Sequence, residues 1–129
     1  MRLNWLGRAG MNNAIRARGQ RYAADWMERL GGRVEGGRVL EVGCGRGVGV
    51  QIILERFRAG TVDAIDLDPK MVECARRHLA ARGLAGVRLN VGDVTHIEAD
   101  EATYDAVFDF GAIHLEPDWP KAIAEVAVF

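Results

Sequence analysis

The chain has 129 residues and a formal net charge of −1, and its residues are 49% hydrophobic and 27% charged. These values predict one globular domain, and they argue against a general nucleic-acid binder, which would carry a large basic excess. No apolar run approaches the ~20 residues that a membrane span needs, so we expect no membrane-spanning segment.

Basic residues are concentrated at the N-terminus, where five arginines precede the first acid, Asp25: Arg2, Arg8, Arg16, Arg18 and Arg21. This distribution indicates a basic amphipathic helix that lies on an acidic body. Cys44 and Cys74 fit neither a metal-ligand spacing nor a disulfide framework. We therefore expect no metal, and we expect reduced cysteines in a cytoplasmic protein.

Residues 1–36 are expected to form a helical cap in front of the first strand. Within residues 14–30, four apolar side chains recur at helical spacing as one stripe: Ile15, Tyr22, Trp26 and Leu30. We expect this stripe to pack on the sheet, and a lid over a ligand is the alternative. Gly31 and Gly32 end the helix.

The central stretch, residues 39–47, is a short aliphatic run followed by glycines at positions 43, 45 and 47. The pattern predicts a buried strand over residues 39–42, a glycine turn, and a helix over residues 48–58. A strand, turn and helix in this order direct free backbone N–H groups at one point, and glycine lets a ligand approach the backbone closely. A tight connection without a ligand is the alternative.

Further elements follow in regular alternation. We expect strands over residues 61–66, 87–91 and 104–110, and a helix that begins at Asp68-Pro69 and ends at Gly83. A last helix over residues 117–129 carries Trp119, Ile123 and Val126 on one side. The alternation predicts an α/β fold, a doubly wound and mostly parallel sheet with residues 37–129 as its core.

Each predicted strand ends in a carboxylate: Glu41, Asp66, Asp93 and Asp109. Parallel strands bring their carboxyl ends to one edge, where open α/β sheets bind ligands. We therefore expect these acids to gather around one polar ligand. Asp68, in contrast, is expected to cap the following helix.

Two kinds of nucleotide ligand fit such an edge. A nicotinamide or flavin dinucleotide favours G-x-G-x-x-G/A, but position 48, where the last small residue would fall, is Val48. A phosphate-binding G-x-x-x-x-G-K-[ST] sequence is absent. A cationic nucleoside without phosphates, such as S-adenosylmethionine, fits the acidic edge better.

Residues 41–47, Glu-Val-Gly-Cys-Gly-Arg-Gly, resemble the first motif of class I S-adenosylmethionine-dependent methyltransferases. The resemblance continues through Asp66, residues 92–94 and residues 104–114, and it covers about residues 37–127. It is greatest for the small-molecule branch of this family. It implies a Rossmann-like fold, S-adenosylmethionine as cofactor with S-adenosylhomocysteine as product, and a small-molecule acceptor.

The resemblance implies cofactor-binding roles for residues at the ends of all four strands: Glu41, Gly43, Cys44, Gly45, Gly47, Asp66, Leu67, Asp93, Val94, Asp109 and Phe110. In this scheme Glu41 and the glycine turn hold the amino-acid end of the cofactor, and Asp66 holds the ribose hydroxyls. Asp93 and the Val94 N–H bind the adenine, which lies against Leu67. Asp109 and Phe110 line the methionine portion.

His114, after the fourth strand, is the histidine expected to act as general base if the acceptor must lose a proton. A residue packed in its loop is the alternative, and His78 and His96 are expected to have no catalytic role.

The chain differs from the family pattern in its length, because three further strands usually follow the last helix. We therefore expect four strands in the order 3-2-1-4, with the C-terminal strands missing and the fourth strand an exposed edge. Such a chain is expected either to pair two copies through this edge as a homo-oligomer or to be only marginally stable. A fragment, a disrupted gene and a short form completed by a partner are the three explanations of the missing strands. A catalytically silent cofactor-binding or interaction subunit is the alternative to a methyltransferase. An NAD(P)-dependent oxidoreductase is less favoured.

Overall fold

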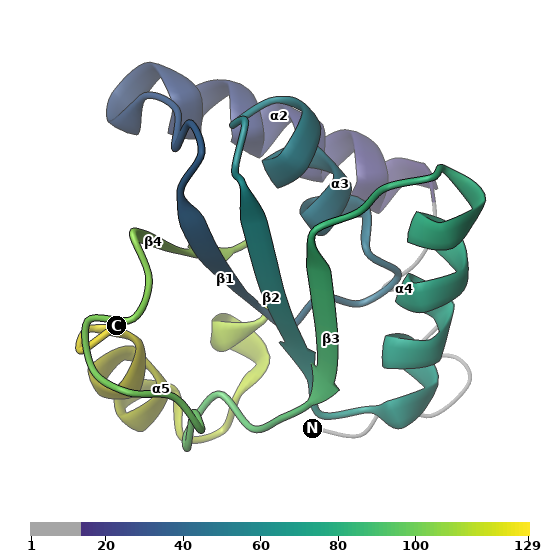
Figure 1. Cartoon of the computed structure of the whole chain (residues 1–129). Helices are drawn as coiled ribbons and strands as arrows, with labels where there is room; N and C mark the ends of the chain where they lie inside the picture. The colour runs from purple at the N-terminus through teal and green to yellow at the C-terminus, as the bar shows by residue number, and fades with distance from the viewer. Residues whose placement is uncertain (1–13) are drawn as a thin grey trace.

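The computed structural model describes residues 14–129, and its centre is a parallel sheet of four strands in the order β3-β2-β1-β4 (Figure 1). This order confirms the sequence prediction. The elements follow one another as α2 (Ala14–Gly31), β1 (Arg38–Val42), α3 (Val48–Glu55), β2 (Thr61–Asp66), α4 (Pro69–Ala81), β3 (Val87–Val91), β4 (Ala106–Asp109), the 3-10 helix η1 (Ile113–Leu115) and α5 (Trp119–Val126).

The register of the sheet brings the carboxyl ends of its strands together. Val42 at the end of β1 is aligned with Ile65 of β2 on one side and with Asp109 of β4 on the other. Asp66 of β2 is aligned with Val91 of β3. Residues that follow these strands therefore lie along one edge of the sheet, as expected for an open parallel sheet.

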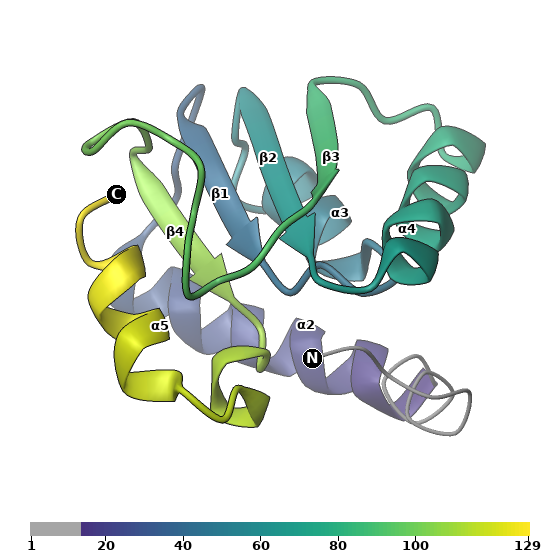
Figure 2. The same cartoon turned by 90° about the horizontal axis from the view of Figure 1, so that it is seen from below.

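Helices cover the two faces of the sheet unequally (Figures 1 and 2). On one face, side chains of α2, α3 and α4 form the main core with the strands, and Phe57 contacts Phe108 edge-on at a centroid distance of 4.8 Å. On the other face, Leu40 and Val42 pack with α5 and with the connection over residues 92–105. The sheet is thus doubly wound, and β1 is buried from Val39 to Val42.

Three predicted elements are longer than the observed ones. Helix α3 ends at Glu55 rather than at residue 58, and Arg58 adopts a left-handed φ of 62° that is incompatible with a continued helix. Strand β4 occupies residues 106–109, and α5 ends at Val126. None of the described helices is long and apolar enough to cross a membrane.

The predicted packing face of α2 is wrong. The stripe of Ile15, Tyr22, Trp26 and Leu30 points away from the protein, and these side chains are 79%, 65%, 49% and 84% exposed. The opposite face carries Ala24, which is completely buried, and Met27, which packs against the main core. Small side chains allow α2 to approach α3 closely, and ion pairs from Arg56 of the 55–60 turn to α2 fix that face.

Candidate functional site

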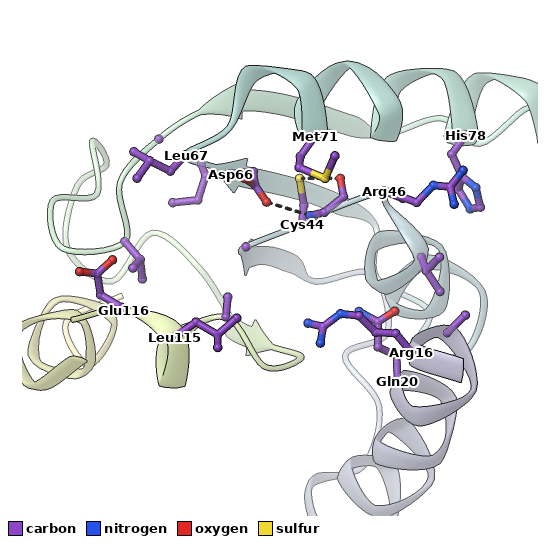
Figure 3. A pocket seen from close by; sticks show the side chains of 18 of the residues that line it. Arg16, Gln20, Cys44, Arg46, Asp66, Leu67, Met71, His78, Leu115 and Glu116 are labelled. Atoms are coloured by element: carbon purple, nitrogen blue, oxygen red, sulfur yellow. Dashed lines mark hydrogen bonds between the residues drawn. The ribbon is translucent and has the colours of Figure 1, made fainter. Parts of the chain in front are cut away.

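A pocket of about 410 Å³ lies at the carboxyl ends of the strands, a volume suited to a small-molecule ligand (Figure 3). Its floor is the glycine turn with the ends of β2 and β3. Helix α2 closes one side, α4 another, and the segment after β4 a third. Seven of the residues predicted to bind a cofactor line this pocket: Gly43, Cys44, Gly45, Asp66, Leu67, Asp93 and Val94.

The glycine turn requires its glycines for steric reasons. Gly43 has a φ of 71°, and a Cβ at that position would lie 2.0 Å from the Cβ of Ala112. Gly47 has a φ of 86° where it begins α3. Because side chains rarely tolerate positive φ, glycine at these positions allows the turn to pass closely under the segment that follows β4 at Gly43 and close to Ala75 of α4 at Gly47.

Asp66 connects the glycine turn to the start of α4. One carboxylate oxygen accepts a hydrogen bond from the Gly45 N–H at 3.0 Å, and the other accepts one from the Asp68 N–H at 2.9 Å. Each carboxylate oxygen can accept two hydrogen bonds, so both keep capacity for a ligand hydroxyl. Asp68 caps α4 as predicted, since its side chain accepts from the Lys70 N–H at 3.0 Å.

Asp93 lies on the far side of the same pocket. Its carboxylate accepts hydrogen bonds from the Thr95 hydroxyl at 2.7 Å and from the Thr95 N–H at 2.8 Å. These two bonds hold the pKa of Asp93 below its ordinary value, so the carboxylate is charged at neutral pH. The arrangement gives the pocket a second fixed acceptor after Asp66.

Glu41 lies beneath the glycine turn, completely buried, and neither of its carboxylate oxygens accepts a hydrogen bond from any residue in the described range 14–129. Gly49 of α3 makes room for it, since a Cβ there would lie 2.0 Å from Glu41 Oε1. Desolvation by burial, and then the nearby carboxylates of Asp109 and Asp66, raise the pKa of Glu41 well above its ordinary value. A buried carboxyl without a partner is unusual, and a cationic group is the partner that suits it.

The residues predicted at the end of β4 do not line the pocket. Asp109 accepts hydrogen bonds from the N–H groups of Gly111 at 2.9 Å and of Ala112 at 2.6 Å, and so shapes the loop. Phe110 stacks on Phe108 at 5.9 Å. Both support the loop from below, and their contact with a cofactor stays a prediction.

His114 is exposed, and the pocket is lined instead by its neighbours Leu115 and Glu116. The structure therefore places His114 outside the pocket wall, because the 3-10 turn η1 directs Leu115 inward. Within residues 14–129 no hydrogen bond or ion pair joins His114 to the other predicted site residues, and its role as a base also stays a prediction.

Sequence reasoning missed the residues that close the pocket from the two helices: Ala14, Arg16, Ala17, Gln20, Met71, His78 and Arg82. Figure 3 shows Arg16 and Gln20 facing the cavity from α2, across from Met71 of α4. His78, for which no catalytic role is expected, lines the pocket, and its Nε2 lies 2.9 Å from the Gln51 side-chain oxygen. Helical periodicity from Met71 could have indicated His78 and Arg82, because positions 71, 78 and 82 share a helix face.

Arginines make the α4 end of this pocket electropositive. Desolvation, and then the charges of Arg82, Arg46 and Arg21, lower the pKa of His78. Neutral His78 can therefore act as a hydrogen-bond donor or acceptor at neutral pH. The pocket thus has acidic residues near the strand ends and basic residues toward the helices.

A methyltransferase-domain family matches residues 39–128 of the chain. The chain is 37% identical to the fatty-acid O-methyltransferase of Mycolicibacterium smegmatis over 95 residues. This match spans 73% of this chain and 33% of that protein. It is 35% identical to the aklanonic acid methyltransferase of a Streptomyces species, over 73% of this chain and 43% of that protein. The chain thus spans between a third and a half of the length of these curated relatives.

The fold is shared with solved structures. An S-adenosylmethionine-dependent methyltransferase from Aquifex aeolicus superposes with a TM-score of 0.80 at 21% identity, over 98% of this chain and 67% of that chain. At this identity the similarity shows the fold alone. The family match over residues 39–128, which includes the glycine turn and the strand-end acids, shows more: the chain belongs to the methyltransferase-domain family.

Proposed function

We propose that this chain binds S-adenosylmethionine in the strand-end pocket and supports methyl transfer to a small-molecule acceptor. The observation that carries the proposal is Glu41, a buried carboxyl without a hydrogen-bond partner among residues 14–129, beside the glycine turn. An ammonium group is the kind of partner that satisfies it, and the amino-acid end of S-adenosylmethionine carries one. The dinucleotide cofactors of oxidoreductases would bring phosphates instead, which acidic residues repel.

The remaining pocket residues fit the same ligand. Asp66 keeps acceptor capacity for two ribose hydroxyls, and Asp93 is a charged acceptor suited to an exocyclic amine. Leu67 and Val94 supply apolar surface for the adenine between them. When bound, the cofactor supplies a methyl group activated by a sulfonium. The chain's own contribution is to bind the cofactor and to align it, and alignment can provide much of the acceleration of a displacement reaction.

The acceptor class is suggested by the relatives. Their names describe methylation of a fatty acid and of aklanonic acid. An acidic group of such an acceptor would find hydrogen-bond donors in the pocket wall, from Arg16, Arg82 and His78. We therefore propose a small acidic molecule as acceptor, and a catalytically silent cofactor-binding subunit is the second candidate because the chain spans less than half of these relatives.

Titration calorimetry with S-adenosylmethionine, S-adenosylhomocysteine and NAD tests the cofactor. Asp66→Ala is expected to weaken S-adenosylmethionine binding by about 1.5–3 kcal/mol, roughly tenfold to a hundredfold, because it removes a charged acceptor. Asp118→Ala, an exposed acid outside the pocket, is the matched control and should bind normally. Preferential binding of NAD, or equal binding by both variants, would contradict the proposal. Turnover of an acceptor panel then separates an enzyme from a silent subunit.

The edge of β4 bears on the assembly of the protein. Within residues 14–129, β4 pairs only with β1, so its outer edge has free backbone groups. We propose that a second copy pairs with this edge. We also propose that the protein works in the cytoplasm, because Cys44 and Cys74 are both free thiols. A monomer in sedimentation with micromolar cofactor affinity would contradict the pairing.

A further inference from the structure

Helix α2 presents an apolar surface to the outside of the protein. Ile15, Tyr22 and Trp26 occupy one side of the helix, on the opposite side from the buried Ala24. At 1.5 Å per residue this stripe is roughly 16 Å long from Ile15 to Trp26. In Figure 1, α2 runs along the top of the molecule with the sheet beneath it. Large adjoining apolar side chains that face outward usually mark a binding surface.

Positive charge borders this stripe. By helical geometry Arg18 and Arg29 lie next to Tyr22 on the outer side of α2, and both are exposed. The Arg29 guanidinium lies 5.7 Å from the centre of the Trp26 ring. Neither arginine forms an ion pair with a carboxylate of the described residues, whereas Asp25 and Glu28 of the same helix are paired with Arg56. The outer side of α2 therefore combines aromatic and aliphatic groups with uncompensated positive charge.

We propose that the outer face of α2, formed by Ile15, Arg18, Tyr22, Trp26 and Arg29, binds the surface of an anionic lipid membrane. Helices that lie in a membrane interface bury an apolar side in the headgroup region and place basic side chains against anionic lipids. Tyr and Trp suit that position because their rings are apolar and their N–H or O–H groups remain hydrated. This surface is separate from the pocket, so the proposal stands whether or not the pocket transfers methyl groups.

Charge also disfavours a second copy as the partner of this face. Two antiparallel α2 helices that packed through the stripe would bring Arg18 of one copy near Arg29 of the other. Such like charges oppose association, whereas anionic headgroups neutralise them. A lipid surface therefore satisfies both the apolar and the charged part of this face.

Co-sedimentation of the purified protein with vesicles tests the proposal. One set contains phosphatidylcholine with phosphatidylglycerol, and the other contains phosphatidylcholine alone. We expect binding to the anionic vesicles to be about 25-fold tighter, from about fivefold for each of the two arginines, and to weaken at high salt.

Two variants separate the contributions to binding. Tyr22→Gln with Trp26→Gln should reduce binding to anionic vesicles by at least tenfold, through loss of apolar burial. Arg18→Gln with Arg29→Gln should leave only the weak binding seen with phosphatidylcholine. Trp119→Gln with Ile123→Gln is the matched control: both side chains are about half exposed on α5, and this variant should bind as the unmodified protein does.

Three results would overturn the proposal. The first is equal binding to both kinds of vesicle, and the second is normal vesicle binding by the Tyr22 and Trp26 variant. The third is an absence of vesicle binding together with dissociation of a dimer when the stripe is changed, which would identify a second copy as the partner. Circular dichroism confirms that each variant is folded before binding is compared.

Discussion

Replacing Glu41 by Met should stabilise the protein while it abolishes the proposed cofactor site. The Glu41 side chain is completely buried, and neither carboxylate oxygen accepts a hydrogen bond within residues 14–129. Leaving such a polar group buried and unsatisfied costs about 1–3 kcal/mol, and a methionine of similar volume removes that cost. We therefore expect a gain of about 2 kcal/mol, which at about 4 °C per kcal/mol raises Tm by about 8 °C.

The gain should grow with pH. Burial, followed by the carboxylates of Asp109 and Asp66, raises the pKa of Glu41 above its ordinary value of 4.5. As pH rises past 4.5 the carboxyl ionises in the unfolded chain but stays protonated in the folded chain, so the unmodified protein loses stability until the folded pKa is passed. Glu41→Met has no carboxyl at this position and does not lose stability in this way. The difference in free energy of unfolding between the two proteins should therefore widen from acidic to neutral pH.

Urea unfolding at a series of pH values, without ligand, measures both effects. Glu55→Met on the exposed side of α3 is the matched control, and it should change stability by less than about 0.5 kcal/mol. A lower stability of Glu41→Met than of the unmodified protein, or a stability gain that is independent of pH, would contradict this prediction. Either result would mean that Glu41 already has a partner within the protein.

Four further substitutions test the packing and the ion pair between Asp63 and Arg88. Gly49→Ala places a Cβ 2.0 Å from Glu41 Oε1 and should lower the free energy of unfolding in urea by about 1–3 kcal/mol. Gly19→Ala on α2 is the control: its Cβ has no neighbour within 4 Å, and the substitution should raise the free energy of unfolding by up to about 1 kcal/mol. Asp63→Asn weakens two 2.7 Å bonds from Arg88 and should cost about 2 kcal/mol at neutral pH. Desolvation raises the pKa of Asp63, but the hydrogen bonds that its carboxylate accepts, first those from Arg88, outweigh it, so this pKa lies below its ordinary value of 3.8. The stability that Asp63 contributes should therefore be lost as the pH falls through the lowered pKa. A destabilisation by Asp63→Asn that is as large in acid as at neutral pH would contradict this. Phe57→Ala should cost about 3–5 kcal/mol, measured by thermal unfolding, and a loss below 1 kcal/mol would show that the core repacks around the cavity.

The parts of the site that follow directly from strand ends could be predicted from the sequence. Asp66 and Asp93 line the pocket, and the glycine turn forms its floor. Their positions depend only on where a strand stops and on the rule that parallel strands end at one edge. Arg16, Gln20 and His78 could not be found in this way, because they reach the pocket through the packing of whole helices. His114 shows the same limit, since a single 3-10 turn decides which side chain after β4 faces inward.

The sequence by itself determined the alternation of strands and helices and the place of the glycine turn, because hydrophobic period and glycine spacing are local properties. The strand order was expected from the resemblance to the methyltransferase family. Only the tertiary structure decided which face of α2 is buried. That helix has two candidate faces, one aromatic and one with Ala24 and Met27, and periodicity alone favours the more hydrophobic one. Close contact with α3 needs small side chains and the ion pairs to Arg56, so the aromatic face remains outside.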